Sequence, residues 1–70
     1  MALSTADQEE LELLLIEEAD AWFDYLNATL GQPEARYNEV EPWAWAQLKQ
    51  RLRAIRNRRK RINRRPGLAA

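Results

Sequence analysis

The placement of glycine and proline constrains this chain most, because these two residues interrupt helices. Residues 5–30 contain neither, and residues 43–65 contain neither. Gly31, Pro33 and Pro42 lie between the two stretches, and Pro66-Gly67 follows the second. The sequence therefore predicts two long helices separated by a connection.

The start and end of the first helix are marked by ordinary capping signals. Ser4 with Asp7, or Thr5 with Gln8, matches a capping box. Gly31 is the expected left-handed stop, and Pro33 follows it. The first helix is predicted over about residues 5–30.

The second helix is predicted over about residues 42–64, with Pro42 as its first residue. Residues 31–41 would then form the connection, in which residues 36–40 could make one strand-like stretch. Residues 63–70 are predicted to form a basic C-terminal tail. The fold class is all-α: one antiparallel helical hairpin over residues 1–70.

The composition indicates how such a hairpin is stabilised. A chain of 70 residues buries only about 60% of its unfolded surface, so its stability margin is small. It contains no cysteine and no histidine, which excludes disulfides and thiolate or imidazole metal sites. Oligomerisation or a partner is therefore expected to complete the core. We predict no catalytic residue, no cofactor and no metal site, and hence a protein that is not an enzyme.

The first helix has an apolar face of roughly 200°, wider than one partner helix covers. Leu11, Leu15, Trp22 and Leu26 form its predicted central stripe. The excess apolar surface indicates a second protein contact rather than cover by the short connection. The predicted protein interface comprises three residues of this helix and a tryptophan of the second: Leu14, Phe23, Tyr25 and Trp43.

The second helix has a narrower stripe at 3-4 spacing, formed by Trp45, Leu48, Leu52, Ile55, position 59 and Ile62. Folding the two helices antiparallel places Leu15 near Arg59 and brings Glu18 within about a turn of that arginine. We predict that Glu18 and Arg59 form an ion pair that fixes the register of the hairpin.

Charge is divided between the two halves of the chain. Residues 1–41 carry a net charge of −10 and residues 42–70 carry +10. A group of cationic side chains near the C-terminus is predicted to contact DNA or an acidic protein: Arg58, Lys60, Arg61, Arg64 and Arg65. The alternative is that the acidic first helix neutralises them, and the net charge of zero favours that alternative.

Several short segments together resemble one known family. They are Gln8-Glu9-Glu10-Leu11, Gly31-Gln32 with Tyr37, the positions Leu48, Leu52 and Ile55, and the clusters Arg58-Arg59-Lys60-Arg61 and Arg64-Arg65-Pro66-Gly67. This pattern resembles the small head-completion and head–tail connector proteins of tailed bacteriophages, of the lambda gpW type. That family has a β-hairpin between its helices, and residues 31–41 lack the alternation of one.

The resemblance implies a virion protein that binds neighbouring subunits, either copies of itself or portal and adaptor proteins. Its basic end would lie near DNA. It implies a location in the virion, or in the host cytoplasm during assembly, and the chain has neither a secretory signal nor a membrane span. No small-molecule substrate is expected. Two alternatives remain open: a small nucleic-acid-binding regulator that uses the same arginines, and a regulatory or inhibitor subunit that binds a protein.

Overall fold

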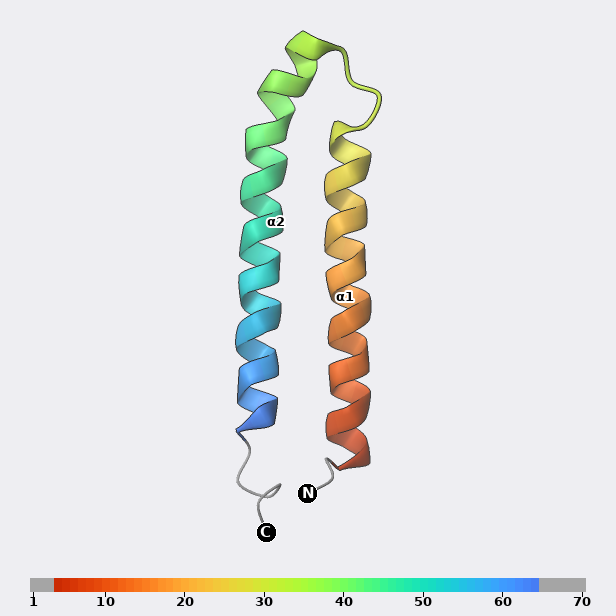
Figure 1. The fold of residues 1–70 in the computed structure, drawn as a ribbon, viewed down its shortest axis with the longest axis vertical. Coiled ribbons are helices and arrows are strands. Elements are labelled where there is room, and N and C mark those ends of the chain that lie inside the picture. Colours follow the sequence, from red (N-terminus) through yellow and green to blue (C-terminus); the bar gives the residue numbers. More distant parts are fainter. Residues whose placement is uncertain (1–3, 65–70) are drawn as a thin grey trace.

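The computed structural model describes residues 4–64, which form two helices. Helix α1 spans Thr5–Thr29 and helix α2 spans Glu34–Asn63. They run antiparallel, side by side, and join at one end of an elongated molecule (Figure 1). No strand occurs within residues 4–64. The prediction of an all-α helical hairpin is confirmed.

The ends of α1 follow from its capping residues. The Ser4 hydroxyl accepts a hydrogen bond from the Asp7 backbone N–H at 3.1 Å, which satisfies one of the free donors of the first turn. At the other end, Leu30 N–H donates to the Leu26 carbonyl at 2.8 Å. Gly31 follows at φ 73°, a left-handed conformation that disfavours residues with a Cβ atom. This glycine is therefore the stop that the sequence predicts.

The predicted connection over residues 31–41 is wrong, as is the strand-like stretch within it. Only residues 30–33 separate the helices, and α2 begins at Glu34 with Pro33 as its N-cap. Pro33 fixes its own φ, and the acidic Glu34 suits the positive end of the helix dipole. These signals are sufficient to start a helix eight residues before Pro42.

Pro42 lies inside α2 rather than at its start. It has no N–H to donate to the carbonyl four residues earlier, and such a position bends a helix. The first turns of α2 lean over relative to the rest of the helix (Figure 1). The added turns also carry Glu41, which accepts a hydrogen bond from the Tyr25 hydroxyl at 2.7 Å. The bend is therefore accompanied by an extra contact between the helices.

The core is a single seam between the two helices. Leu14 and Ala21 are buried on α1, and they are seven residues apart. The buried residues of α2 are Ala44, Leu48, Ile55 and Ile62, of which the last three repeat every seven residues. This is the spacing of a coiled-coil seam. The predicted stripe of α2 is confirmed at Leu48, Ile55 and Ile62.

The predicted central stripe of α1 is wrong in its orientation. Leu15 is 59% exposed, Leu26 is 45% exposed and Trp22 is 42% exposed, whereas Leu14 is fully buried. Helix α1 is therefore rotated so that Leu14 and Ala21 face α2. Leu15, Trp22 and Leu26 lie to one side of the contact between the helices. Neither helix within residues 4–64 has an apolar stretch long enough to cross a membrane.

Candidate interaction surfaces

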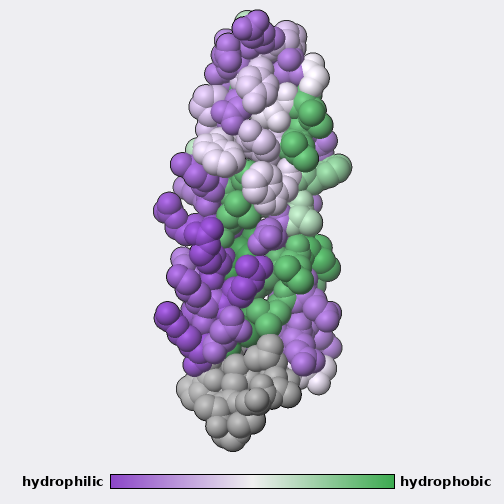
Figure 2. All heavy atoms as spheres, viewed as in Figure 1, coloured by the Kyte–Doolittle hydropathy of each residue, from purple (hydrophilic) through white to green (hydrophobic). Residues whose placement is uncertain are grey.

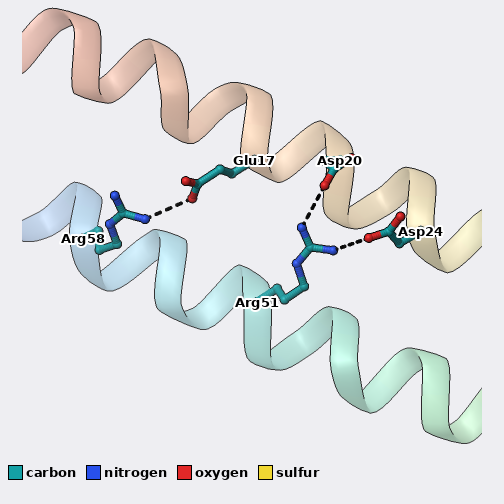
Figure 3. A network of polar contacts seen from close by, with 5 residues as sticks. All are labelled: Glu17, Asp20, Asp24, Arg51 and Arg58. Atoms are coloured by element: carbon teal, nitrogen blue, oxygen red, sulfur yellow. Dashed lines mark hydrogen bonds and ion pairs between the residues drawn. The ribbon is translucent and has the colours of Figure 1, made fainter.

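A row of ion pairs connects the helices along one side of the seam (Figure 3). Arg51 places Nη1 2.6 Å from Asp24 Oδ2 and Nη2 3.2 Å from Asp20 Oδ2. About two helical turns further along α2, Arg58 Nη1 lies 3.0 Å from Glu17 Oε2. The hydrogen bonds to Asp24 and then Asp20 raise the pKa of the Arg51 guanidinium above its ordinary value. These contacts occupy the guanidinium groups of Arg51 and Arg58.

The pair predicted between Glu18 and Arg59 is present in the structure. Arg59 Nη2 lies 3.3 Å from Glu18 Oε2, and both side chains are partly exposed. This pair borders a groove that Trp22, Leu52 and Arg56 also line. Helical geometry places that groove on the side of the seam opposite Arg51. Ion pairs therefore fix the relative position of the helices from both sides.

The contribution of this pair to register gives a measurable prediction. A double-mutant cycle with Glu18→Ala and Arg59→Ala is expected to give a coupling free energy of about 0.5–1 kcal/mol, because the pair is partly exposed and screened by water. Urea unfolding followed by circular dichroism measures it. The matched control is the exposed pair of Arg36 and Glu39 within α2, with a coupling of about 0.3 kcal/mol. Additive effects at Glu18 and Arg59 would contradict the prediction.

Tyr25 belongs to a polar and aromatic contact between the helices. Its ring packs edge-on against Trp45 at a centroid distance of 5.8 Å and against Trp22 at 6.3 Å. Its hydroxyl donates to Glu41 Oε2. The hydrogen bond to Glu41, followed by burial, raises the pKa of Tyr25 from 10.0 to about 12. Tyr25 thus joins α1 to the start of α2 and is not available as a separate docking residue.

The raised pKa of Tyr25 predicts a stability that depends on pH at the alkaline end. Folding favours the protonated phenol, so this contribution is complete below pH 10 and is lost as the pH rises towards about 12. An absorbance titration in a Tyr37→Phe background, where Tyr25 is the remaining tyrosine, measures its pKa directly. We expect Glu41→Gln to lower that pKa, because it removes the principal cause of the shift. An unchanged Tyr25 pKa in the Glu41→Gln variant would contradict the assignment of the shift to this hydrogen bond.

The four residues of the predicted protein interface do not form one surface. Leu14 is fully buried in the seam, so its assignment to a docking surface is wrong. Phe23 and Trp43 are both exposed, at 60% and 59%. Trp43 lines a groove beside Asp24 and Arg51, whereas the helical period places Phe23 on the side of α1 that faces away from α2. The wide apolar face of α1 explains the error, because periodicity alone does not say which part of it meets α2.

The predicted basic contact residues are divided by the structure. Arg58 is paired with Glu17, whereas Lys60, Arg61 and Arg64 are exposed and form no ion pair within residues 4–64. Arg65 lies outside the described residues. The sequence pattern did not separate paired arginines from unpaired ones, and the contact with DNA or an acidic protein stays a prediction.

A regular row of cations runs along the outer face of α2, and we name it the basic stripe: Lys49, Arg53, Arg56, Lys60 and Arg64. Each is exposed, and within the described part of the chain none forms an ion pair. Their spacing of three or four residues keeps them on one face over about 22 Å. Lys49, Arg53 and Arg56 were not predicted as contact residues. The 3-4 spacing on the face opposite Leu48 and Ile55 is the signal that identifies them.

A second row, which we name the apolar seam, runs along the free side of α1: Leu15, Ala19, Trp22, Leu26 and Leu30. All five are exposed. Figure 2 shows hydrophobic side chains gathered along one face of the molecule, beside hydrophilic side chains over α2. Exposed apolar surface of this extent is typical of an interaction site. The free surface is therefore divided into an apolar part on α1 and a basic part on α2.

The shape of the molecule agrees with an incomplete core. Its radius of gyration is 16.4 Å, whereas a compact domain of this length has about 11 Å. Within residues 4–64, no third element covers either side of the two packed helices. Among residues 4–64 no group of three or more acidic side chains is arranged to hold a metal ion.

No family model matches the sequence, and neither a curated protein nor a solved structure shows significant similarity to it.

Proposed function

We propose that this protein is a non-enzymatic assembly protein that binds other protein subunits through α1. The observation that carries the proposal is the apolar seam, whose side chains remain exposed after α1 and α2 have packed. A hairpin that leaves Trp22 and Leu26 in water gains stability when a protein surface covers them. The resemblance in the helix-start, turn and arginine segments supports a specific form of this role, as a bacteriophage head-completion or head–tail connector component.

The basic stripe has a secondary role in this proposal. It lies on α2, and only Arg56 borders the apolar seam, in the groove that it lines with Trp22. The helical period turns Lys49, Arg53, Lys60 and Arg64 further from α1. A subunit bound to α1 therefore leaves these four cations available. Cations at helical spacing neutralise phosphates without reading sequence. In an assembled particle they would lie against DNA or an acidic protein neighbour.

Nucleic-acid binding by the isolated protein distinguishes this role from that of a regulator. We expect a short labelled duplex to bind at physiological salt only in the non-specific range, with Kd about 1–100 µM. The plot of log Kd against log salt concentration gives the number of phosphates contacted. Replacing both Arg56 and Lys60 by glutamine is expected to reduce that slope by about 2. Arg36→Gln removes one charge near the turn and is the matched control, with an unchanged slope.

The second candidate function is a small nucleic-acid-binding regulator, and the observation that favours it is the row of five unpaired cations. A dedicated regulator binds its site at Kd about 10 nM or tighter at physiological salt. Binding of that strength to a duplex or a single strand, lost in the Arg56→Gln/Lys60→Gln variant, would overturn the assembly proposal. Binding that is weak and independent of sequence supports it.

A further inference from the structure

We propose that the apolar seam binds a second copy of the same chain, with the two α1 helices antiparallel about a two-fold axis near Trp22. The inference rests on the proposed function and names the partner. It concerns the five residues Leu15, Ala19, Trp22, Leu26 and Leu30, which lie on one side of α1 and carry no charge.

The residues of the apolar seam are spaced almost symmetrically about Trp22, so the apolar seams of two antiparallel copies are complementary. Around Trp22, the residues Ala19 and Leu26 lie at nearly equal distances along the helix, three and four residues away. Leu15 and Leu30 lie seven and eight residues away. An antiparallel second copy therefore places Ala19 against Leu26 of the other chain, and Leu15 against its Leu30. A two-fold contact requires this reciprocity, in which residue i meets j and j meets i.

The hairpin exposes more surface than a compact domain of its mass. The accessible surface is 5411 Å², whereas a compact monomer of 8.2 kDa exposes about 4,500 Å². This difference of roughly 900 Å² is spread over the whole two-helix molecule, and the exposed side chains of the apolar seam are part of it. The alternation of small Ala19 with large Trp22 and Leu26 also suits interdigitation of two helices.

Charge favours α1 as the contact helix and favours the antiparallel direction. The outer face of α2 carries the basic stripe, so contact between two α2 helices would bring like charges together. The first turns of α1 are acidic, with Glu9 and Glu12 among them. A parallel pair would place these acidic ends side by side, whereas an antiparallel pair separates them by the length of the helix. The chain as a whole has zero formal charge, so two copies have no net repulsion.

Sedimentation equilibrium of the full chain tests whether the second copy binds. We expect a mass twice the monomer's 8.2 kDa at tens of micromolar, and the monomer mass for Leu26→Lys. Because Leu26 is exposed in the hairpin, that variant should keep its helical circular dichroism. Leu13→Lys is the matched control, because Leu13 is also exposed but lies outside the apolar seam. We expect the Leu13→Lys variant to remain a dimer.

Engineered cysteines test the direction of pairing, since the chain has no cysteine of its own. Under mild oxidation, a mixture of Ala19→Cys and Leu26→Cys chains should form the mixed disulfide, identified by mass. Ala19→Cys alone should stay largely reduced, as should Leu13→Cys. Cross-linking of Ala19→Cys with itself would overturn the antiparallel arrangement, because only parallel helices bring those positions together.

A monomer mass at every concentration would overturn the second copy as the partner. That result leaves the proposed function to be decided by the duplex titration, which does not depend on self-association. If the protein is a monomer that binds duplex weakly, only the proposal of a second copy as partner is contradicted. If the protein is a monomer that binds duplex at nanomolar concentrations, the proposed assembly function is contradicted as well.

Discussion

Leu14→Ala is expected to lower the free energy of unfolding by about 3–5 kcal/mol, the range for removing a fully buried leucine. Leu14 is 0% exposed and packs in one cluster with Ile55 and Ile62. The neighbouring Leu13 is 56% exposed. Leu13→Ala is therefore the matched control, and we expect a change within about 0.5 kcal/mol.

Urea unfolding followed by far-UV circular dichroism measures both variants. A domain of this size has a total stability of only about 5 kcal/mol, so Leu14→Ala is expected to be largely unfolded without added stabiliser. Equal effects of the two substitutions would contradict the rotation of α1 described above. They would also return Leu14 to the docking surface from which burial excludes it.

Pro42→Ala is expected to raise the free energy of unfolding by about 1–3 kcal/mol. Pro42 is inside α2, where a proline costs about 3 kcal/mol relative to alanine through the lost hydrogen bond and the clash of its ring. The bend already relieves part of that cost, so the gain is smaller than the full amount.

Thermal and urea unfolding measure this gain, and far-UV circular dichroism should show no loss of helix. Pro33→Ala is the matched control: Pro33 precedes the first turn of α2, where no helical hydrogen bond is restored. We expect a change of about 0.5 kcal/mol or less there. A lower stability for Pro42→Ala would show that the bend is needed for the contact between Tyr25 and Glu41.

The hairpin itself was predictable because local signals and long-range charge agree. Ser4 caps α1, Gly31 ends it, and the Leu48, Ile55 and Ile62 repeat identifies the buried side of α2. Antiparallel folding of an acidic and a basic helix then brings Glu18 to Arg59. Each of these depends on short-range chemistry or on a single narrow stripe.

The rotation of α1 was not predictable from its apolar pattern. When hydrophobic residues cover more than half of a helix, several rotations bury similar area, and the choice depends on other contacts. In the rotation observed, the carboxylates of Glu17, Asp20 and Asp24 meet arginines of α2. In the same rotation Leu14 faces α2 and Trp22 stays exposed. The start of α2 was missed for a related reason. A proline within a helix is locally unfavourable, and contacts with α1 outweigh its cost.

The sequence predicted that an apolar surface lies on α1 and a basic surface on α2, but it did not predict which residues belong to each. The excess apolar surface of α1 and the cationic end of α2 are both visible in the sequence. Only the structure shows which cations are paired, because the ion pairs of Arg51, Arg58 and Arg59 depend on how the two helices pack. The basic stripe comprises five of the six cations that are exposed and unpaired within residues 4–64; Arg61, which lies on another face, is the sixth.

Sedimentation velocity of the full chain, alone and mixed with a labelled duplex at physiological salt and tens of micromolar protein, distinguishes assembly through α1 from nucleic-acid binding as the primary activity. We expect the protein to sediment as an assembly larger than its monomer, held together through α1. With the duplex at the same molar concentration as the protein, we also expect self-assembly to be unchanged, because the duplex contacts α2 and binds weakly. A monomeric protein that moves entirely with the duplex would contradict the account and establish nucleic-acid binding as the primary activity.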